Sequence, residues 1–268
     1  MTTLLWIILA TTVSGVLSVL AAGTFLALPA RSREAALPHL VSFATGALLG
    51  AALLALIPHA VEGAGIGNVH QVGIALIAGI ALFFVLEKFL LWRHCHDDHC
   101  HEHTVADAHQ HDHNHDRARQ KASGSLVLIG DALHNVLDGV LIAAAFLTDV
   151  HLGIVTALAI MAHEIPQEVG NFAVLLHSGV SRGRALGLNL LTSLTAVIGG
   201  VIGYFALGTA LTVLPFALAV AAASLLYVAV ADLIPGLHRK VDPRSSVMQV
   251  LLIGCGIAII ALAENNAH

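Results

Sequence analysis

Two apolar stretches of this chain carry charged and polar side chains where a membrane-spanning helix ordinarily has none. The first reads Asp131-Ala132-Leu133-His134-Asn135-Val136-Leu137-Asp138-Gly139, and the second reads His163-Glu164-Ile165-Pro166-Gln167-Glu168-Val169-Gly170-Asn171. Each lies inside a run that is long enough to cross a bilayer. An ionisable group in hydrocarbon costs at least a few kcal/mol, so such groups usually face a partner or a water-filled path. The two stretches therefore predict a polar functional site at membrane depth.

The composition excludes an ordinary water-soluble domain. Hydrophobic residues make up 57% of the 268 residues and charged residues only 11%, whereas soluble domains carry about 25% charged residues. The formal net charge of -5 leaves no basic surface for nucleic acid. Cys95, Cys100 and Cys255 are an odd number of cysteines without the spacing of a disulfide framework. No basic residue precedes Arg31, so the first apolar run is interpreted as a retained span and not as a signal peptide.

Apolar runs of about 20 residues, the length that crosses a bilayer, predict an all-α integral membrane protein with eight transmembrane helices. The runs lie near residues 3–29, 38–60, 71–92, 124–148, 151–176, 184–207, 211–235 and 246–264. All 12 Lys and Arg residues fall in the odd-numbered connections between these runs or at the span ends beside them. Because cytoplasmic loops are enriched in Lys and Arg, these connections are predicted to be cytoplasmic and both termini extracytoplasmic. Residues 1–268 are expected to form a single transmembrane domain.

The third connection, residues 93–123, is rich in histidine and has almost no apolar content. It is therefore predicted to be a disordered cytoplasmic loop between the third and fourth helices. Imidazole and thiolate groups bind transition metals, although a solvated linker is an alternative interpretation. The spacing is too irregular for a closed structural zinc site, which needs four fixed ligands. The candidate ligands of this loop are His94, Cys95, His96, His99, Cys100, His101, His103, His109, His111, His113 and His115.

The polar residues of the two central spans share helical faces. On the fourth span they are offset by three, four and seven positions from Asp131, which places them in one stripe about two turns long. Imidazole, carboxylate and amide groups together suit divalent zinc, iron, manganese, cobalt or cadmium. Pro166 is expected to bend the fifth span, and Gly139 and Gly170 to let the two spans approach closely. The predicted metal ligands are His134, Asn135, Asp138, His163, Glu164, Gln167 and Glu168.

Other polar residues lie at different depths of the predicted bundle and suggest a path for an ion. Two of them are at the outer end of the second span, where an entrance is expected, and the others lie toward the inner side. The candidate pathway residues are His59, Glu62, Asp131, His177 and Asp232.

The two central motifs resemble those of the ZIP (Zrt/Irt-like protein) family of divalent-metal transporters. The family's fourth-span signature is similar to His134-Asn135-x-x-Asp138-Gly139, and the fifth-span signature of its LIV-1-like branch is similar to His163-Glu164-Ile165-Pro166-x-Glu168. The likeness continues to Gly179 and includes the His-rich third connection. It implies an eight-helix fold, metal uptake toward the cytoplasm, and ligands at His134, Asn135, Asp138, His163, Glu164 and position 167.

This chain departs from the family pattern at two places. Position 167, normally His or Glu, is Gln, a neutral amide that binds metal only weakly through its oxygen. The sixth span offers no carboxylate where some relatives have one, so a second metal position would have fewer anionic ligands. The polar residues of that span are Asn189, Thr192, Ser193 and Thr195.

The function that these observations favour is transport of divalent metal ions, with zinc as the first candidate. No enzyme activity and no resident cofactor are expected. The partners expected are metal ions and lipid, with a homodimer as an option, and the expected location is a bacterial inner (plasma) membrane. Three other functions are alternatives: a hydrolase, a metal buffer or sensor, and a cation-diffusion exporter. His163-Glu164-x-x-Gln167 is one residue away from the His-Glu-x-x-His of zinc metalloproteases, which leaves an intramembrane zinc-dependent hydrolase. A membrane-anchored metal buffer or sensor would use the loop, and cation-diffusion exporters typically have six spans.

Overall fold

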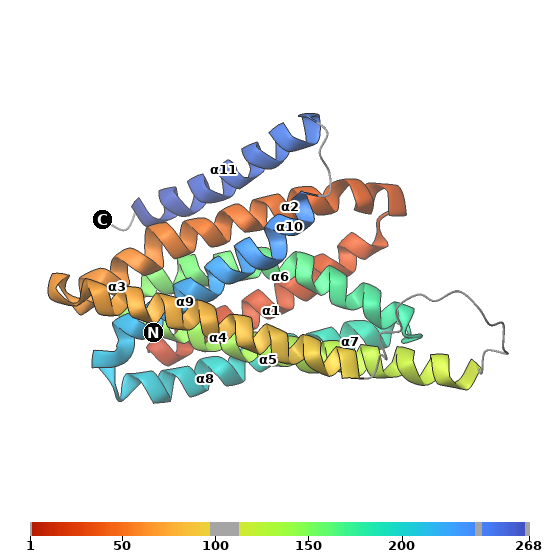
Figure 1. Cartoon of the computed structure of the whole chain (residues 1–268), viewed down its shortest axis with the longest axis horizontal. Helices are drawn as coiled ribbons and strands as arrows, with labels where there is room; N and C mark the ends of the chain where they lie inside the picture. Colours follow the sequence, from red (N-terminus) through yellow and green to blue (C-terminus); the bar gives the residue numbers. More distant parts are fainter. Residues whose placement is uncertain (1, 97–112, 239–242, 266–268) are drawn as a thin grey trace.

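The structure, a computed structural model, describes the backbone of residues 2–96, 113–238 and 243–265, and the side chains of residues 2–88, 124–125, 127–238 and 244–265. This part of the chain is helical and contains no strand (Figure 1). The helices are α1 (Thr3–Ala27), α2 (Ala30–Gly50), α3 (Ile57–Ala64), α4 (Val69–His96), α5 (His113–Thr148), α6 (Val150–His177), α7 (Arg182–Ser193), α8 (Thr195–Gly208), α9 (Leu214–Tyr227), α10 (Ile234–Leu237) and α11 (Pro243–Asn265). Short turns connect some of them, namely the π-helical η1 (Ala51–Leu56) and η4 (Val228–Leu233) and the 3-10 helical η2 (Ile66–Asn68) and η3 (Leu211–Val213).

The predicted all-helical membrane architecture is confirmed, with seven to eight candidate spans among the described residues. Seven segments of the described residues are long and apolar enough to cross a membrane: Thr3–Ala27, Ala30–Ala64, Ile66–Lys88, Val127–Thr148, Arg182–Gly208, Leu211–Leu237 and Arg244–Asn265. The remaining span is α6, a 28-residue helix that lies alongside them in the bundle (Figure 1). Its polar residues include four of the predicted site: His163, Glu164, Gln167 and Glu168.

The helices on either side of the third connection are longer than the predicted spans. α4 continues to His96 and α5 begins at His113, so helix covers residues 93–96 and 113–123 of the stretch predicted to be disordered. The polar start of α5 is rich in Arg, Gln, Lys and Ala, which are strong helix formers even without apolar partners. Residues 97–112, the middle of that stretch, lie outside the described residues.

Two of the spans are interrupted by π-helical turns that precede a proline. η1 runs directly into α3, which has Pro58 in its first turn, and η4 runs directly into α10, which has Pro235 in its first turn. Proline has no N–H to donate to the preceding turn, and a π-helical turn accommodates the resulting break in the hydrogen-bond ladder. The second and seventh spans are therefore each built as helix, π-turn and helix.

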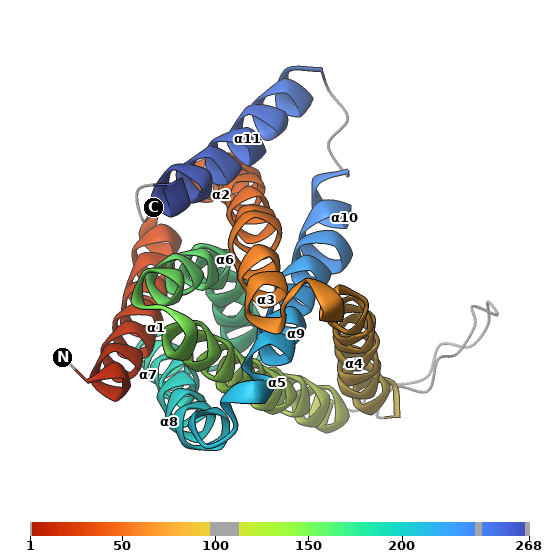
Figure 2. The ribbon, with the colours of Figure 1, turned by 90° about the vertical axis from the view of Figure 1, so that its left-hand side faces the viewer.

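The helices pack as two groups. The first helix group consists of α1, α5, α6, α7 and α8, which pack mainly on one another. In the second helix group, α2 packs on α11, while α4 and α3 pack on α9 (Figure 2). Contacts of α2 with α6 and of α5 with α9 join the groups, so the two polar helices α5 and α6 both lie at this boundary.

Glycines set the closest helix approaches within each group. A Cβ added at Gly139 of α5 would lie 2.0 Å from the carbonyl oxygen of Ala196 on α8, and one added at Gly46 of α2 would lie 2.1 Å from that of Ile253 on α11. The expectation that Gly139 and Gly170 bring the fourth and fifth spans together is wrong. Gly139 faces α8 because adjacent residues point about 100° apart on a helix, and a Cβ at Gly170 would meet no atom within 4 Å.

The two ends of the bundle differ in charge. One end of the bundle holds the last turns of α1 and α4 and the first turns of α2, α7 and α11 (Figure 1). Both chain termini lie at the other end. The described basic residues follow this division and lie in or near those helix ends: Arg31, Arg33, Lys88, Arg182, Arg184 and Arg244. We call this the basic end and the other the opposite end. The segregation predicted from sequence is thus present in the fold.

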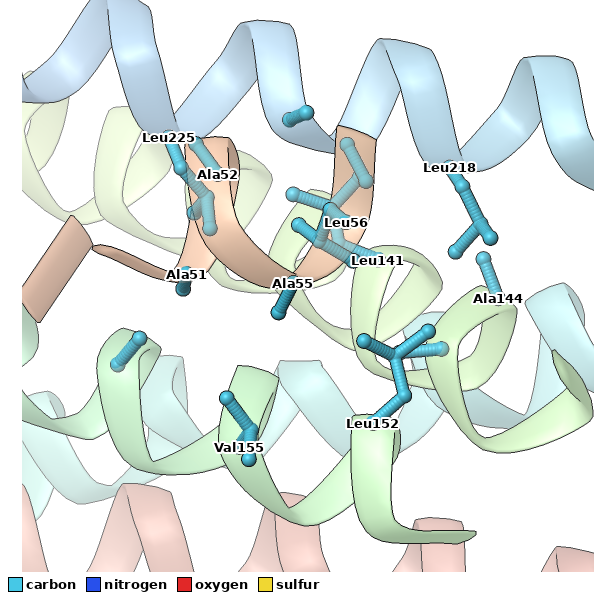
Figure 3. Packing of buried hydrophobic residues seen from close by; sticks show 14 of the residues in the cluster. Ala51, Ala52, Ala55, Leu56, Leu141, Ala144, Leu152, Val155, Leu218 and Leu225 are labelled. Atoms are coloured by element: carbon cyan, nitrogen blue, oxygen red, sulfur yellow. The ribbon is translucent and has the colours of Figure 1, made fainter. Parts of the chain in front are cut away.

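The main apolar core fills the half of the bundle nearer the opposite end. There η1, the C-terminal part of α5, the N-terminal part of α6, and α9 bring small and branched side chains together (Figure 3). Leu56, Ala55 and Leu152 have no exposed surface at all. This core closes the space between the polar residues of α5 and α6 and the opposite end.

Candidate metal site

Three side chains of α5 and α6 converge on one point inside the bundle. The Nε2 atoms of His134 and His163 are 3.3 Å apart, and they lie 3.5 Å and 3.6 Å from Oδ2 of Asp138. His134 and Asp138 are one helical turn apart on α5, and His163 faces them from α6. Among the described residues these three form a group whose ligand atoms all lie within 4.8 Å of one another.

The size of this triangle fits a transition metal. The three ligand atoms are about 3.5 Å apart, so the centre of their triangle lies about 2.0 Å from each atom, the edge length divided by √3. Zinc binds His nitrogen and carboxylate oxygen at about 2.0–2.2 Å. Oδ2 of Asp138 is buried and accepts no hydrogen bond from the described residues. Two imidazole nitrogens and one carboxylate oxygen are thus arranged as three ligands of one cation.

A cavity leads from this triangle toward the basic end. Its volume is about 490 Å³, and it is lined by residues of α2, α4, α5, α6, α9 and η4, including both site histidines. The side chain of His134 is 22% exposed, whereas those of Asp138 and His163 are only 2% exposed. An ion in the cavity would therefore reach the site past His134.

Four buried carboxyl groups lie in or around the triangle, and among the described residues none of them pairs with a Lys or Arg. Asp131, Asp138, Glu164 and Glu168 are each 5% exposed or less. Within the described part of the chain, Asp138 forms salt bridges with the two site histidines, and the other three carboxyl groups form none. Buried charges are ordinarily paired or bind metal ions, so a cation is the partner that would balance these carboxyl groups in their ionised form.

The comparisons with known proteins agree with this geometry. The family model described as "ZIP Zinc transporter" matches residues 1–264. The chain belongs to the ZIP zinc transporter family. It is 34% identical over 242 residues to "Zinc transporter ZIP13" of Pongo abelii, and the aligned region covers 84% of this chain and 66% of that protein. It is 30% identical over 298 residues to "Zinc transporter SLC39A7" of Mus musculus, and the aligned region covers 83% of this chain and 61% of that protein. The chain thus spans less than two thirds of the length of these two relatives.

Within this ZIP chain, two further predicted ligands are held by serine hydroxyls. Ser18 of α1 donates to Oε2 of Glu164 at 3.1 Å, and Ser193 of α7 donates to Oε1 of Glu168 at 2.6 Å. Both carboxyl groups are buried beside the triangle but lie outside the three-residue group. The sequence pattern identified the acids but not the two serines, which come from other helices.

The amide at position 167, where the ZIP signature normally has His or Glu, contacts Asp131 instead of the triangle. Nε2 of Gln167 donates to Oδ1 of Asp131 at 3.2 Å, and Nδ2 of Asn171 donates to the same oxygen at 2.7 Å. Asn135 lies one turn further along α5 and donates to the backbone carbonyl of Asp131 at 3.0 Å. Asp131 is therefore fixed by amides, in a position next to the site.

The candidate pathway residues separate into two sets. Asp232 lines the cavity, together with Gln167 of the site, whereas His177 is exposed at the end of α6 and lines none of the cavities described here. His59 lies toward the opposite end, with Nδ1 2.9 Å from the carbonyl oxygen of Ala55 and 3.7 Å from Oε1 of Glu264. Glu62 is exposed nearby. The apolar core lies between the triangle and these two pathway residues, His59 and Glu62.

Two polar residues of the cavity are not evident from the sequence pattern. Glu87 of α4 lines it, and its carboxylate accepts a hydrogen bond from the Tyr227 hydroxyl of α9, which also lines it. In the sequence, an acid near the end of a predicted span looks like any charge at the membrane interface, so the place of Glu87 in the cavity becomes evident only from the packing of α4 against α9.

The candidate ligands of the third connection lie outside the part of the chain that the structure describes. This holds for the whole residue at His99, Cys100, His101, His103, His109 and His111, and for the side chain at His94, Cys95, His96, His113 and His115.

Proposed function

We propose that this integral membrane protein transports divalent metal ions, zinc in the first place, toward the cytoplasm through His134, Asp138 and His163. The observation that carries the proposal is a triangle of ligand atoms of the right size at membrane depth, opening into a cavity at one end. Membership of the ZIP zinc transporter family supports the same function. A transport site binds metal modestly, because the ion must also leave.

We infer that the basic end faces the cytoplasm, since Lys and Arg are enriched in cytoplasmic loops. Both termini are then extracytoplasmic. The cavity lies on the basic-end side of the triangle and the apolar core lies on the other side, which supports an inward-facing arrangement. Access from outside requires the first helix group to move relative to the second, which is the common way in which transporters alternate access.

The remaining polar residues are assigned supporting roles in the same proposal. An incoming ion would pass His59 and Glu62 and reach Asp138 from the outer side. A narrow space lined by Asn135, Asp138 and Glu164 lies there, and these side chains would take the ion over from water. Asp131 and Glu168 would adjust the charge around the site, with Gln167 holding Asp131 in place. Asp232 and His177 would lie along the exit.

The geometry favours a transporter over the hydrolase and the buffer. A metalloprotease needs both residues one turn apart on a helix to bind zinc, whereas here His163 faces the triangle and Gln167 bonds to Asp131. A buffer that worked through the third connection would not need a buried triangle with its own cavity. We propose accordingly that the chain is no enzyme, has no resident cofactor, and acts in a bacterial inner (plasma) membrane, as a monomer or a homodimer.

Metal uptake into proteoliposomes is the direct test. Uptake of Zn²⁺ should exceed that of Fe²⁺, Mn²⁺, Co²⁺ and Cd²⁺, and His134→Ala should abolish it because one corner of the triangle is lost. His70→Ala, an exposed histidine at the opposite end, is the matched control and should keep wild-type uptake. No uptake of any metal by correctly folded protein would refute the proposal.

A second prediction concerns the exit. Replacing Asp232 by Asn should slow uptake by roughly tenfold, since the cavity loses a carboxylate that draws the ion from the site. Binding at the triangle should remain nearly unchanged, which equilibrium metal titration of the same variant would show. His177→Ala removes a polar group at the same end but outside the cavity and should have little effect; a larger effect than that of Asp232→Asn would contradict this path.

A further inference from the structure

A second cavity of about 410 Å³ lies at the basic end and shares no lining residue with the cavity of the metal site. Its walls are largely apolar and are formed by Leu20 and Leu26 of α1, Phe172 and Leu176 of α6, and Leu186 of α7. The volume lies within the range of about 300–1,000 Å³ that is usual for ligand pockets. Walls of this kind suit a hydrocarbon chain.

Two arginines give this apolar cavity a positive charge. Arg33 in the first turn of α2 and Arg182 at the start of α7 both line it. Nε of Arg33 is buried and has no hydrogen-bond partner among the described residues. A buried donor without a partner is costly, and guanidinium groups bind phosphate oxygens in pairs. The cavity therefore combines an apolar slot with two groups that recognise phosphate.

We propose that this cavity binds one anionic phospholipid, with its phosphate between Arg33 and Arg182 and an acyl chain along α1 and α6. Basic pockets between transmembrane helices on the cytoplasmic side recognise anionic headgroups in this way. The proposal rests on the proposed function in one respect, since it requires the basic end to face the leaflet that carries these lipids.

The lipid would connect the two helix groups. Arg33 belongs to α2 of the second helix group, whereas the rest of the lining comes from α1, α6 and α7 of the first. A molecule held by both groups stabilises the arrangement in which both contacts are made. The inward-facing arrangement has both contacts, so bound lipid should retard the return to an outward-facing one.

Binding can be measured without transport, by native mass spectrometry of the purified full chain in neutral detergent. Wild type should retain phosphatidylglycerol in preference to phosphatidylcholine with the same acyl chains. The double variant Arg33→Gln/Arg182→Gln should lose this preference, by about fivefold for each arginine. The matched control is Arg31→Gln/Arg244→Gln, which removes the same charge at the same end outside the cavity and should keep it. Equal loss in the control, or displacement of the lipid by inorganic phosphate, would overturn the proposal.

Zn²⁺ uptake tests the consequence. In vesicles of phosphatidylcholine, wild type and Arg33→Gln/Arg182→Gln should transport equally, which also shows that the variant is folded. Phosphatidylglycerol at about a fifth of the lipid should lower wild-type uptake several-fold and leave the variant unchanged. An equal response of both proteins would overturn the proposed coupling. Absence of transport in both proteins would refute the transport function instead, because lipid binding is measured separately.

Discussion

Replacing Asp138 by Asn should reduce metal affinity and uptake at least a hundredfold while leaving the protein folded. Asp138 supplies the one carboxylate oxygen of the triangle, and that oxygen is shared by both histidines. Asparagine has nearly the same volume, so packing is kept while the negative charge is removed. Loss of a group that merely supports a metal ligand costs about 10–100-fold in affinity, and loss of the ligand itself should cost more. Metal titration and proteoliposome uptake both measure this effect.

The matched control for this variant is Asp149→Asn. Asp149 precedes α6 and accepts hydrogen bonds from the backbone N–H groups of His151 and Leu152 at the start of that helix. Asparagine caps helices about as well as aspartate, and the residue lies away from the triangle. The control should retain wild-type affinity. If Asp138→Asn also bound and transported metal normally, the ion would have to use other ligands, and the triangle would not be the transport site.

The helices that carry the candidate ligands, and the faces on which these residues lie, were easier to predict from the sequence than the side chains that contact them. His134 and Asp138 are one turn apart on α5, so their proximity follows from helical geometry alone. Polar residues on the next span were expected to face them, because the alternative is exposure of those residues to lipid. The position of His163 opposite both residues follows from the same reasoning. Local periodicity was sufficient for these residues because α5 and α6 are consecutive and antiparallel.

Long-range packing decided the features that the sequence did not reveal. Ser18 and Ser193 reach the site acids from α1 and α7, and an isolated serine in an apolar span gives no signal of such a role. The contact of Gln167 with Asp131 likewise depends on how far α6 is rotated about its axis. Glycines were misassigned for a related reason: a sequence shows that helices can approach closely at a glycine, but not which helix is the partner.

Replacing Gly139 of α5 by Ala should destabilise the bundle far more than the same change at Gly170 of α6. The added Cβ would lie 2.0 Å from the carbonyl oxygen of Ala196 and 2.6 Å from the backbone nitrogen of Gly200, so α5 and α8 must move apart. Overpacking against fixed atoms costs about 3 kcal/mol when backbone must shift. We expect a clear fall in the thermal unfolding midpoint of the detergent-solubilised protein.

Gly170→Ala is the matched control for this last variant. The residue is also helical, and a Cβ there would meet no atom within 4 Å, so alanine should be neutral or slightly stabilising because it favours helix. Similar unfolding midpoints for the two variants would contradict the tight α5–α8 contact. Gly139 directly follows Asp138, so any shift of α5 away from α8 also moves the shared carboxylate relative to His163. The remaining folded fraction of Gly139→Ala should therefore bind metal more weakly, which links the packing of these helices to the geometry of the metal site.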